Sequence, residues 1–232
     1  MTDQHTRHEG HLEFGHEEQR REGVRHRDHE RPSAQAARLL IVGPQGSGKG
    51  TQGARISAAL GIPAVSTGDT FRAAIAAGTA LGAQVKSVIE AGDLVSDSLT
   101  FEVVRDRLQQ ADAAGGFLLD GFPRNLAQVG LLDGYLDARD EPLTGVIELG
   151  VARAVSIERL AERAREQGRT DDTEEVIANR LSIYERETAP ILGIYRERGL
   201  VDTVDGVGSM EAVTERILTA LAARGIARAV AA

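Results

Sequence analysis

The 232-residue sequence contains no cysteine and no tryptophan, and aromatic residues make up only 3% of it. Without cysteine the chain cannot form disulfides, cysteine-bound iron–sulfur clusters or cysteine-containing zinc sites. Its core must therefore be built from Ala, Leu, Ile and Val. Burial of aliphatic surface at about 25 cal/mol per Å² is still enough to stabilise a domain of this size.

Long apolar runs and an excess of positive charge are also missing. No apolar run reaches the roughly 18–20 residues of a transmembrane helix. The N-terminal segment lacks the apolar centre of a signal peptide and is too acidic for a transit peptide. The formal net charge of −8 argues against a general nucleic-acid-binding surface. We therefore expect a cytoplasmic protein with no nucleic-acid or membrane partner.

The N-terminal segment, residues 1–37, differs in composition from the rest of the chain. It contains all six histidines, many Glu and Arg residues and almost no aliphatic residue. Such a segment cannot bury enough apolar surface to offset its ordering entropy, so we expect a disordered, histidine-rich polar tail. The spacing of His5, His8 and His11 keeps a metal-binding tail open as an alternative. Residues 38–232 suit one domain.

Lysine is scarce as well, and one of the two lysines lies in a glycine-rich loop. Residues 43–52 read Gly-Pro-Gln-Gly-Ser-Gly-Lys-Gly-Thr-Gln, and they follow the apolar run Leu39–Val42 and open the amphipathic stretch Thr51–Leu60. A strand, a glycine loop and a helix start in this order predict a phosphate cradle of main-chain amides. The compact ammonium of Lys49 fits such a loop and reaches the outer phosphates. The candidate ATP-binding residues of this loop are Gly46, Ser47, Gly48, Lys49, Gly50 and Thr51.

Beyond residue 38, short apolar runs alternate with amphipathic stretches. The expected strands are Leu39–Val42, Ala64–Ser66, Phe117–Leu119, Val146–Leu149 and Val201–Val204. The expected helices are Gly50–Leu60, Asp69–Ala77, Leu81–Ala91, Ser98–Ala113, Leu126–Ala138, Ala154–Arg165, Thr173–Arg198 and Met210–Ala223. Strands that alternate with helices predict an α/β fold in which helices cover both faces of a parallel sheet.

A second candidate site follows the expected strand Phe117–Leu119. Asp120, Gly121 and Arg124 come directly after it. In open α/β sheets the ligand site lies beyond the carboxyl ends of the strands, so Asp120 is expected close to the glycine loop. A carboxylate there can hold the water shell of Mg²⁺. The alternative is that Asp120 caps a helix.

Four motifs, in this order and spacing, resemble those of the adenylate kinase family. They lie in residues 43–52, 66–72, 120–128 and 171–180. The glycine loop also has Gly50 where the general phosphate-loop pattern has Ser or Thr, which resembles nucleoside monophosphate kinases. The similarity spans roughly residues 38–208.

The resemblance implies a P-loop three-layer sandwich with a five-stranded parallel sheet. It also implies a helical AMP-binding arm at about 66–96 and a lid. Only about ten residues separate Arg163 from Thr173, so the lid, at about 163–173, resembles the short form without zinc. The implied reaction is the reversible, Mg²⁺-dependent transfer of the terminal phosphoryl group of ATP to AMP, giving two ADP. The implied partners are ATP, AMP and ADP, and the implied protein is a monomer.

The resemblance also implies a role for individual residues. The catalytic residues are Lys49, Asp120, Arg124, Arg163, Arg169 and Arg180, and Asp120 holds Mg²⁺ through water. The ATP-binding residues beyond the glycine loop are Arg159, Arg163 and Gly208, with Arg165 as an alternative to Arg163. The AMP-binding residues are Thr67, Arg72, Leu94, Val95, Ser96, Gly121, Phe122, Pro123, Arg124, Gln128, Arg169 and Arg180. The family commonly has Thr where Ser96 stands.

Elementary electrostatics favours the same use of the arginines. Two unit charges 4 Å apart interact by about 4 kcal/mol at an effective dielectric constant of 20, so two polyanions meet only where fixed positive charge is supplied. Arginine offers a planar fork for phosphate, and no general base is required. Surface ion pairs are the ordinary alternative for such arginines. A kinase of UMP or CMP, or a non-catalytic P-loop ATP-binding module, remain alternative functions.

Overall fold

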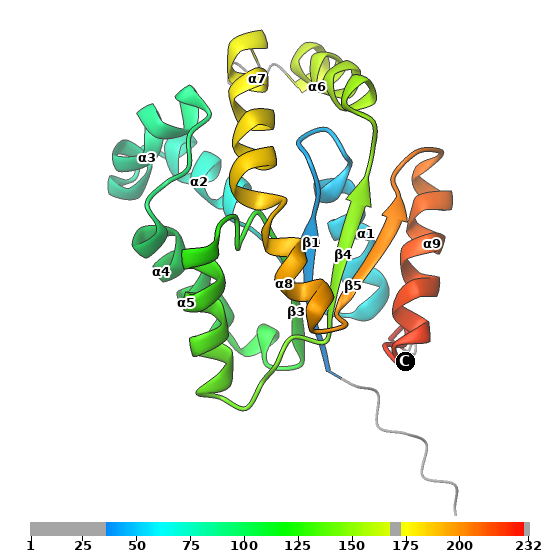
Figure 1. The fold of residues 1–232 in the computed structure, drawn as a ribbon. Helices are drawn as coiled ribbons and strands as arrows, with labels where there is room; N and C mark the ends of the chain where they lie inside the picture. The colour runs from blue at the N-terminus through cyan, green and yellow to red at the C-terminus, as the bar shows by residue number, and fades with distance from the viewer. Residues whose placement is uncertain (1–35, 168–172, 230–232) are drawn as a thin grey trace, which may run out of the picture. The chain divides into compact units, whose positions relative to one another are not determined.

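The computed structural model describes residues 36–167 and 173–229 (Figure 1). The described residues belong to one compact unit. Almost all of the predicted tail lies outside the described residues, and so do Arg169, Asp171 and Asp172. Within the described residues, no helix combines the length and apolar character needed to cross a membrane.

In the described residues, five parallel strands form the central sheet. They are β1 (Ala37–Val42), β2 (Ala64–Ser66), β3 (Gly116–Asp120), β4 (Gly145–Gly150) and β5 (Val201–Asp205), in the spatial order β2-β3-β1-β4-β5. β1 lies at the centre, where Leu39 is paired with Leu118 of β3 and with Gly145 of β4. The predicted α/β class and the five predicted strands are confirmed, with ends that differ by up to two residues.

Helices cover both faces of this sheet. Successive side chains of β1 point to opposite faces, so its apolar residues contribute to a core on each side. Leu39 and Ile41 are packed with α1 (Lys49–Leu60) and α9 (Met210–Ala223). On the other face, Leu40 and Val42 belong to a core that also includes residues of three further helices. These helices are α4 (Asp97–Leu108), α5 (Leu126–Asp137) and α8 (Ile191–Glu197).

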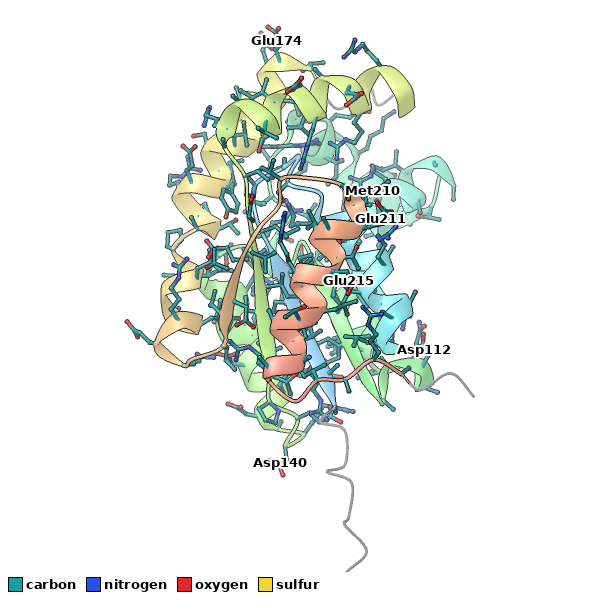
Figure 2. The ribbon with its side chains drawn as sticks, turned by 90° about the vertical axis from the view of Figure 1, so that its right-hand side faces the viewer. Asp112, Asp140, Glu174, Met210, Glu211 and Glu215 are labelled. Carbon is teal, nitrogen blue, oxygen red and sulfur yellow. The ribbon has the colours of Figure 1, made fainter. Side chains whose placement is uncertain are left out.

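Polar contacts also join α1 to α9 on the first face. Gln52 donates to the main-chain oxygen of Met210 at 3.0 Å, and Arg55 pairs with Glu211 at 3.2 Å. Figure 2 shows Met210 and Glu211 at the start of α9 and Glu215 farther along the same helix. These contacts fix α9 against the helix that carries the glycine loop.

Helices make up most of residues 66–96, where the AMP-binding arm is expected. They are α2 (Thr67–Ala76) and α3 (Ala80–Ala91), which share a small core of Phe71, Val85 and Val95. Ser66 caps α2 by accepting from the main-chain N–H of Asp69 at 3.3 Å. Because of this cap the helix begins at Thr67, two residues earlier than predicted.

Two predicted helices are shorter than the sequence pattern indicated. The single helix expected at Thr173–Arg198 is divided into α7 (Glu174–Ile183), a π-helical turn at Tyr184–Thr188, and α8. Pro190 lies at this break. Because proline has no main-chain N–H, it cannot continue the hydrogen bonds of the preceding helix. The helix expected to reach Ala113 ends at Leu108 and is followed by a separate 3₁₀ turn.

Gly82 has no room for a side chain, because α2 and α3 cross closely there. A Cβ atom at Gly82 would lie 2.1 Å from the main-chain oxygen of Ala74. We expect Gly82→Ala to lower the free energy of unfolding by about 1–3 kcal/mol by overpacking. Gly134→Ala on α5 is the matched control, because among the described residues nothing lies within 4 Å of its Cβ position. It should raise stability by about 0.5–1 kcal/mol. Urea unfolding of both variants tests the pair, and equal stability would contradict the close crossing.

Candidate active site

A cavity of about 600 Å³ lies at the carboxyl ends of β1 and β3. The glycine loop contributes Gln45, Gly46, Gly48, Lys49, Gly50 and Thr51 to its lining, and the segment after β3 contributes Asp120, Gly121 and Arg124. The arm contributes Gly68, Asp69 and Arg72, and α6 (Arg153–Gln167) and α7 contribute Arg159, Arg163 and Arg180. The predicted loop, acid and arginine motifs therefore meet around one space.

The glycine loop has the conformation of an anion cradle. Gly46 and Gly48 have φ angles of 80° and 95°, which side chains rarely allow, and α1 begins at Lys49 directly after Gly48. The first N–H groups of a helix have no partner within the helix and carry the positive end of its dipole. This end of the helix lines the cavity, so it can bind phosphate oxygens.

Lys49 folds back over the loop that carries it. Its Nζ donates to the main-chain oxygens of Gly43 at 2.7 Å and Pro44 at 2.9 Å. Burial lowers the pKa of Lys49 to about 8; the Asp120 carboxylate opposes this shift, while Arg124 and Arg163 add to it. The lysine charge is therefore held in surroundings that favour its loss unless an anion is present.

Asp120 ends β3 and faces the first turn of α1. A Cβ at Gly50 would lie 4.0 Å from Oδ2 of Asp120, so an ordinary side chain at position 50 would narrow this approach. Burial raises the pKa of Asp120, and the charges of Lys49 and Arg124 act in the opposite direction. The alternative that Asp120 caps a helix is wrong, because Asn125 caps α5.

The donor chemistry at Asp120 fits one kind of metal ion. In the described part of the chain, no group of three or more His, Cys, Asp or Glu side chains could hold a metal. Mg²⁺ keeps several waters and needs only one or two carboxylates beside substrate phosphates. A single carboxylate next to a phosphate cradle therefore fits Mg²⁺ bound together with a nucleotide.

Arg124 is fixed at three points. Its Nε donates to the main-chain oxygen of Gly121 at 2.8 Å, and its main-chain N–H donates to Gln128 at 2.8 Å. Its carbonyl accepts from the hydroxyl of Thr188 at 2.9 Å. Burial lowers the pKa of Arg124; Asp120 opposes this shift, and Arg180 and Arg72 reinforce it. The guanidinium is thus held among other cations.

Two further arginines reach the same part of the cavity from other elements. Arg72, on α2, pairs with Asp69 one turn before it. Arg180, on α7, donates to the main-chain oxygen of Ile89 at the end of α3 at 3.2 Å. The arm, the β3 loop and α7 therefore bring Arg72, Arg124 and Arg180 to one lining, where an anion would offset their repulsion.

The arginines of α6 lie over the glycine loop. Arg159 donates to the main-chain oxygen of Ser47 at 3.5 Å and of Gly206 at 3.1 Å. Arg163 lines the cavity, four residues farther along the helix. Arg165 is exposed and donates to Ala161 of its own helix, and it is not among the described residues that line the cavity. This geometry favours Arg163 over Arg165 as the second arginine of the pair.

A second, narrow cavity adjoins the first beneath the arm. Both are lined by Gly68, Gly121 and Arg124, whereas Thr67, Phe71, Leu94, Val95 and Gln128 line only the second. Thr67 donates to the main-chain oxygen of Gly121 at 3.0 Å. The guanidinium of Arg124 is thus continuous with a small space whose lining combines apolar side chains with Thr67, Asp93, Thr100 and the neutral amide of Gln128.

Several predicted residues are not part of either cavity lining in the described chain: Ser47, Ser96, Phe122, Pro123 and Gly208. Ser47 and Phe122 are buried, and Phe122 is stacked on Phe101 with ring centroids 6.2 Å apart. Ser96 precedes α4, and Gly208 has a φ angle of 121° near the start of α9. Arg169 lies outside the described residues.

Sequence reasoning missed three side chains that support this site. Thr188 binds the Arg124 carbonyl, Asp97 binds the Gln128 amide, and Asn179 on α7 donates to Ala91 at 3.1 Å and to Asp93 at 2.9 Å. Asn179 lies in the motif at residues 171–180, which by itself indicates no partner for this side chain. Each contact joins residues between 31 and 88 positions apart, so no local pattern indicates it.

In this parallel sheet a glycine loop follows the central strand β1, and the acid Asp120 ends the neighbouring strand β3. This combination defines a P-loop nucleotide-binding protein of the phosphotransferase type. Comparison with known proteins narrows the class. The family model described as "Adenylate kinase" matches residues 41–200. The chain belongs to the adenylate kinase family.

Individual adenylate kinases are similar to this chain over most of their length. The adenylate kinase of Leifsonia xyli subsp. xyli is 56% identical over 188 residues, which cover 81% of this chain and 94% of that protein. The adenylate kinase of Kocuria rhizophila is 55% identical over 184 residues, covering 79% and 98%. That of Clavibacter michiganensis subsp. michiganensis is 52% identical over 189 residues, covering 82% and 94%. The resemblance of the four motifs to this family is confirmed.

Proposed function

We propose that this chain catalyses the reversible transfer of the terminal phosphoryl group of ATP to AMP, giving two ADP, and so contributes to adenine nucleotide homeostasis. The observation that carries the proposal is one cavity with two different anion sites. Main-chain amides and Lys49 form one side, and Arg72, Arg124 and Arg180 form the other. Membership of the adenylate kinase family favours this reaction over a UMP or CMP kinase or a non-catalytic ATP-binding module.

In this proposal the glycine loop, residues 46–51, holds the phosphates of ATP. Lys49 leaves the carbonyls of Gly43 and Pro44 and binds the outer phosphates, whose charge restores the ammonium form that burial disfavours. Arg159 lies above the loop with Arg163, and together with Gly208 they contact ATP. These groups position the donor and offset the charge of the transferring group, which is the main catalytic contribution in phosphoryl transfer.

The acceptor AMP occupies the other side. Arg72, Arg124 and Arg180 bind its phosphate, while Thr67 and Gln128 lie toward its base. Leu94, Val95, Ser96, Gly121, Phe122 and Pro123 complete the AMP side, with Arg169 from the lid. The AMP phosphate is already ionised near neutral pH, so positioning and charge stabilisation are sufficient and no general base is assigned.

Asp120 is the residue that we expect to hold Mg²⁺, through coordinated water. When bound, Mg²⁺ supplies positive charge to the outer phosphate oxygens of ATP. The chain's own contribution is a carboxylate oriented at the edge of the phosphate cradle, beside Gly50. We assign no zinc site to the short lid, since the sequence has no cysteine.

Closure of the arm and the lid over the site is expected to keep water from accepting the phosphoryl group. The arm, about 66–96, and the short lid, about 163–173, would close over both nucleotides and complete the cluster of cations. We further propose a cytoplasmic monomer whose partners are ATP, AMP and ADP, without nucleic-acid or membrane binding.

Acceptor selectivity tests this function directly. ADP formation from MgATP should be rapid with AMP, weak with UMP or CMP, and should fall to background when Mg²⁺ is removed with EDTA. A coupled assay of ADP with each monophosphate measures all three. Turnover with UMP or CMP but not with AMP would contradict the proposed reaction, and ATP binding without ADP formation would favour a non-catalytic module.

A further inference from the structure

We propose that Asp97 is a positioning residue for acceptor specificity: it fixes the orientation of the Gln128 amide, so that the site selects a 6-aminopurine over a 6-oxopurine. This inference rests on the proposed function, in which the second cavity receives the base of the acceptor monophosphate. Asp97 is the first residue of α4, and Gln128 lies in the first turn of α5.

Gln128 is placed where a base would be read. The residue is only 1% exposed, yet it lines the second cavity. Phe71, Leu94 and Val95 form apolar walls there, and Arg124 joins this space to the phosphate side. Thr67, Asp93 and Thr100 also line this space. A neutral amide beside apolar side chains, next to a guanidinium, suits a planar base attached to a phosphate.

The amide of Gln128 has fixed partners at both ends. Its Oε1 accepts from the main-chain N–H of Arg124 at 2.8 Å, and its Nε2 donates to Oδ1 of Asp97 at 2.8 Å. A main-chain N–H can only donate, and a carboxylate can only accept. Rotation of the amide by 180° would place N–H against N–H at one end and oxygen against oxygen at the other. Each buried group left unpaired costs about 1–3 kcal/mol, so one orientation is strongly preferred.

Asp97 is itself held in place by the start of α5. Asn125 donates from Nδ2 to the same Oδ1 of Asp97 at 2.9 Å. The Oδ1 of Asn125 accepts from the main-chain N–H of Gln128, also at 2.9 Å, and so caps the helix. The carboxylate therefore receives two amide donors from one helix end, which sets its position relative to Gln128.

This orientation gives the open edge of Gln128 a defined polarity. An amide offers two N–H groups and two carbonyl lone pairs. Among the described residues one of each is used, which leaves one N–H beside one lone pair. Adenine offers an amino donor at position 6 beside an acceptor at N1, so the two edges match. Hypoxanthine, the base of IMP, offers an acceptor at position 6 beside a donor at N1, and would match only the rotated amide.

The test compares AMP with IMP, because these acceptors differ only at this edge. kcat/KM for each is measured at saturating MgATP. We expect the AMP/IMP ratio to fall severalfold in Asp97→Asn, because a neutral amide oxygen holds the Nε2 of Gln128 more weakly than a carboxylate does. The asparagine amide can also turn its NH₂ group toward a rotated Gln128 carbonyl. The KM for ATP should not change. Asp106→Asn is the control: it removes the same charge from an exposed position on α4, where Asp106 pairs with Arg105 at 3.2 Å, and should leave the ratio unchanged.

Other outcomes would overturn the inference. If Asp97→Asn lowers kcat/KM for AMP and IMP equally, Asp97 has only a structural role. Asp97→Ala should also reduce the AMP/IMP ratio. Thermal unfolding shows whether the alanine variant folds, and if it does not, the isosteric Asp97→Asn is the variant that decides. If the wild type phosphorylates AMP and Asp97→Asn has the same AMP/IMP ratio as the wild type, only this inference is refuted. If the wild type does not phosphorylate AMP, the proposed function is refuted as well.

Discussion

Arg124→Ala is expected to reduce kcat/KM for AMP several hundredfold, which corresponds to about 3–4 kcal/mol of lost transition-state stabilisation. Among the described arginines, Arg124 alone lines both cavities, and three hydrogen bonds fix its main chain and its guanidinium. A group held in this way needs little reorganisation when charge develops on the acceptor phosphate. Steady-state kinetics with varied AMP and saturating MgATP gives the size of the loss.

Two further variants make this result specific. Arg105→Ala removes a partly exposed arginine paired with Asp106 on α4 and should change kcat/KM less than twofold. Arg124→Lys keeps the charge but loses the planar fork, so it should lie between the wild type and Arg124→Ala. A loss below tenfold in Arg124→Ala, with the fold intact by thermal unfolding, would show that the phosphate is bound elsewhere.

Lys49→Met is expected to reduce phosphoryl transfer by about a thousandfold and at the same time to stabilise the nucleotide-free protein by about 1–2 kcal/mol. The loss of activity follows from removal of the cation at the donor phosphates. The gain in stability follows from burial, which lowers the pKa of Lys49 to about 8 from 10.5. The lost bonds to Gly43 and Pro44 reduce this gain.

The gain in stability should depend on pH in a defined direction. Between about pH 8 and 10.5 the unfolded chain binds more protons at Lys49 than the folded chain does, so the stability of the wild type rises across this range. The destabilisation by Lys49 is therefore complete below pH 8 and fades toward pH 10.5. Urea unfolding of wild type and Lys49→Met at pH 7 and pH 10 should give a larger difference at pH 7.

Lys86 is the natural control for this experiment, since the sequence has only these two lysines. Lys86 is exposed on α3 and lies 3.9 Å from Glu90. Lys86→Met should change neither the activity nor the pH dependence of stability by a measurable amount. An equal difference at both pH values for Lys49→Met would show that the charge of Lys49 is not destabilising in the folded protein.

The central part of the fold was predictable because it depends on local patterns. The apolar runs of β1 and β3 are each followed by a short chemical motif, and parallel strands bring such motifs to one edge of the sheet. Lys49 and Asp120 could be placed together on that basis. The division of the long helix at Pro190 was missed, because the amphipathic pattern continues across the break.

The supporting contacts were not predictable for a different reason. Thr188 reaches Arg124 across 64 positions, and Asp97 reaches Gln128 across 31. In a sequence, a threonine such as Thr188 or an aspartate such as Asp97 looks like an ordinary surface or capping residue. Only the packing of α4, α5 and the π-helical turn gives these side chains their partners. Whether Arg163 or Arg165 reaches the cavity depends in the same way on how α6 is turned, and Arg163 is the one among the described lining residues.

The segment from Glu174 to Thr188 links the end of α3 to the loop after β3. It carries Asn179 and Arg180, which bind the end of α3, and it ends at Thr188, which binds the Arg124 carbonyl. A chimaera that receives a foreign lid should therefore be joined before Glu174. A junction inside this segment would change the rotation or length of these helices, and with it the spacing between the end of α3 and Arg124.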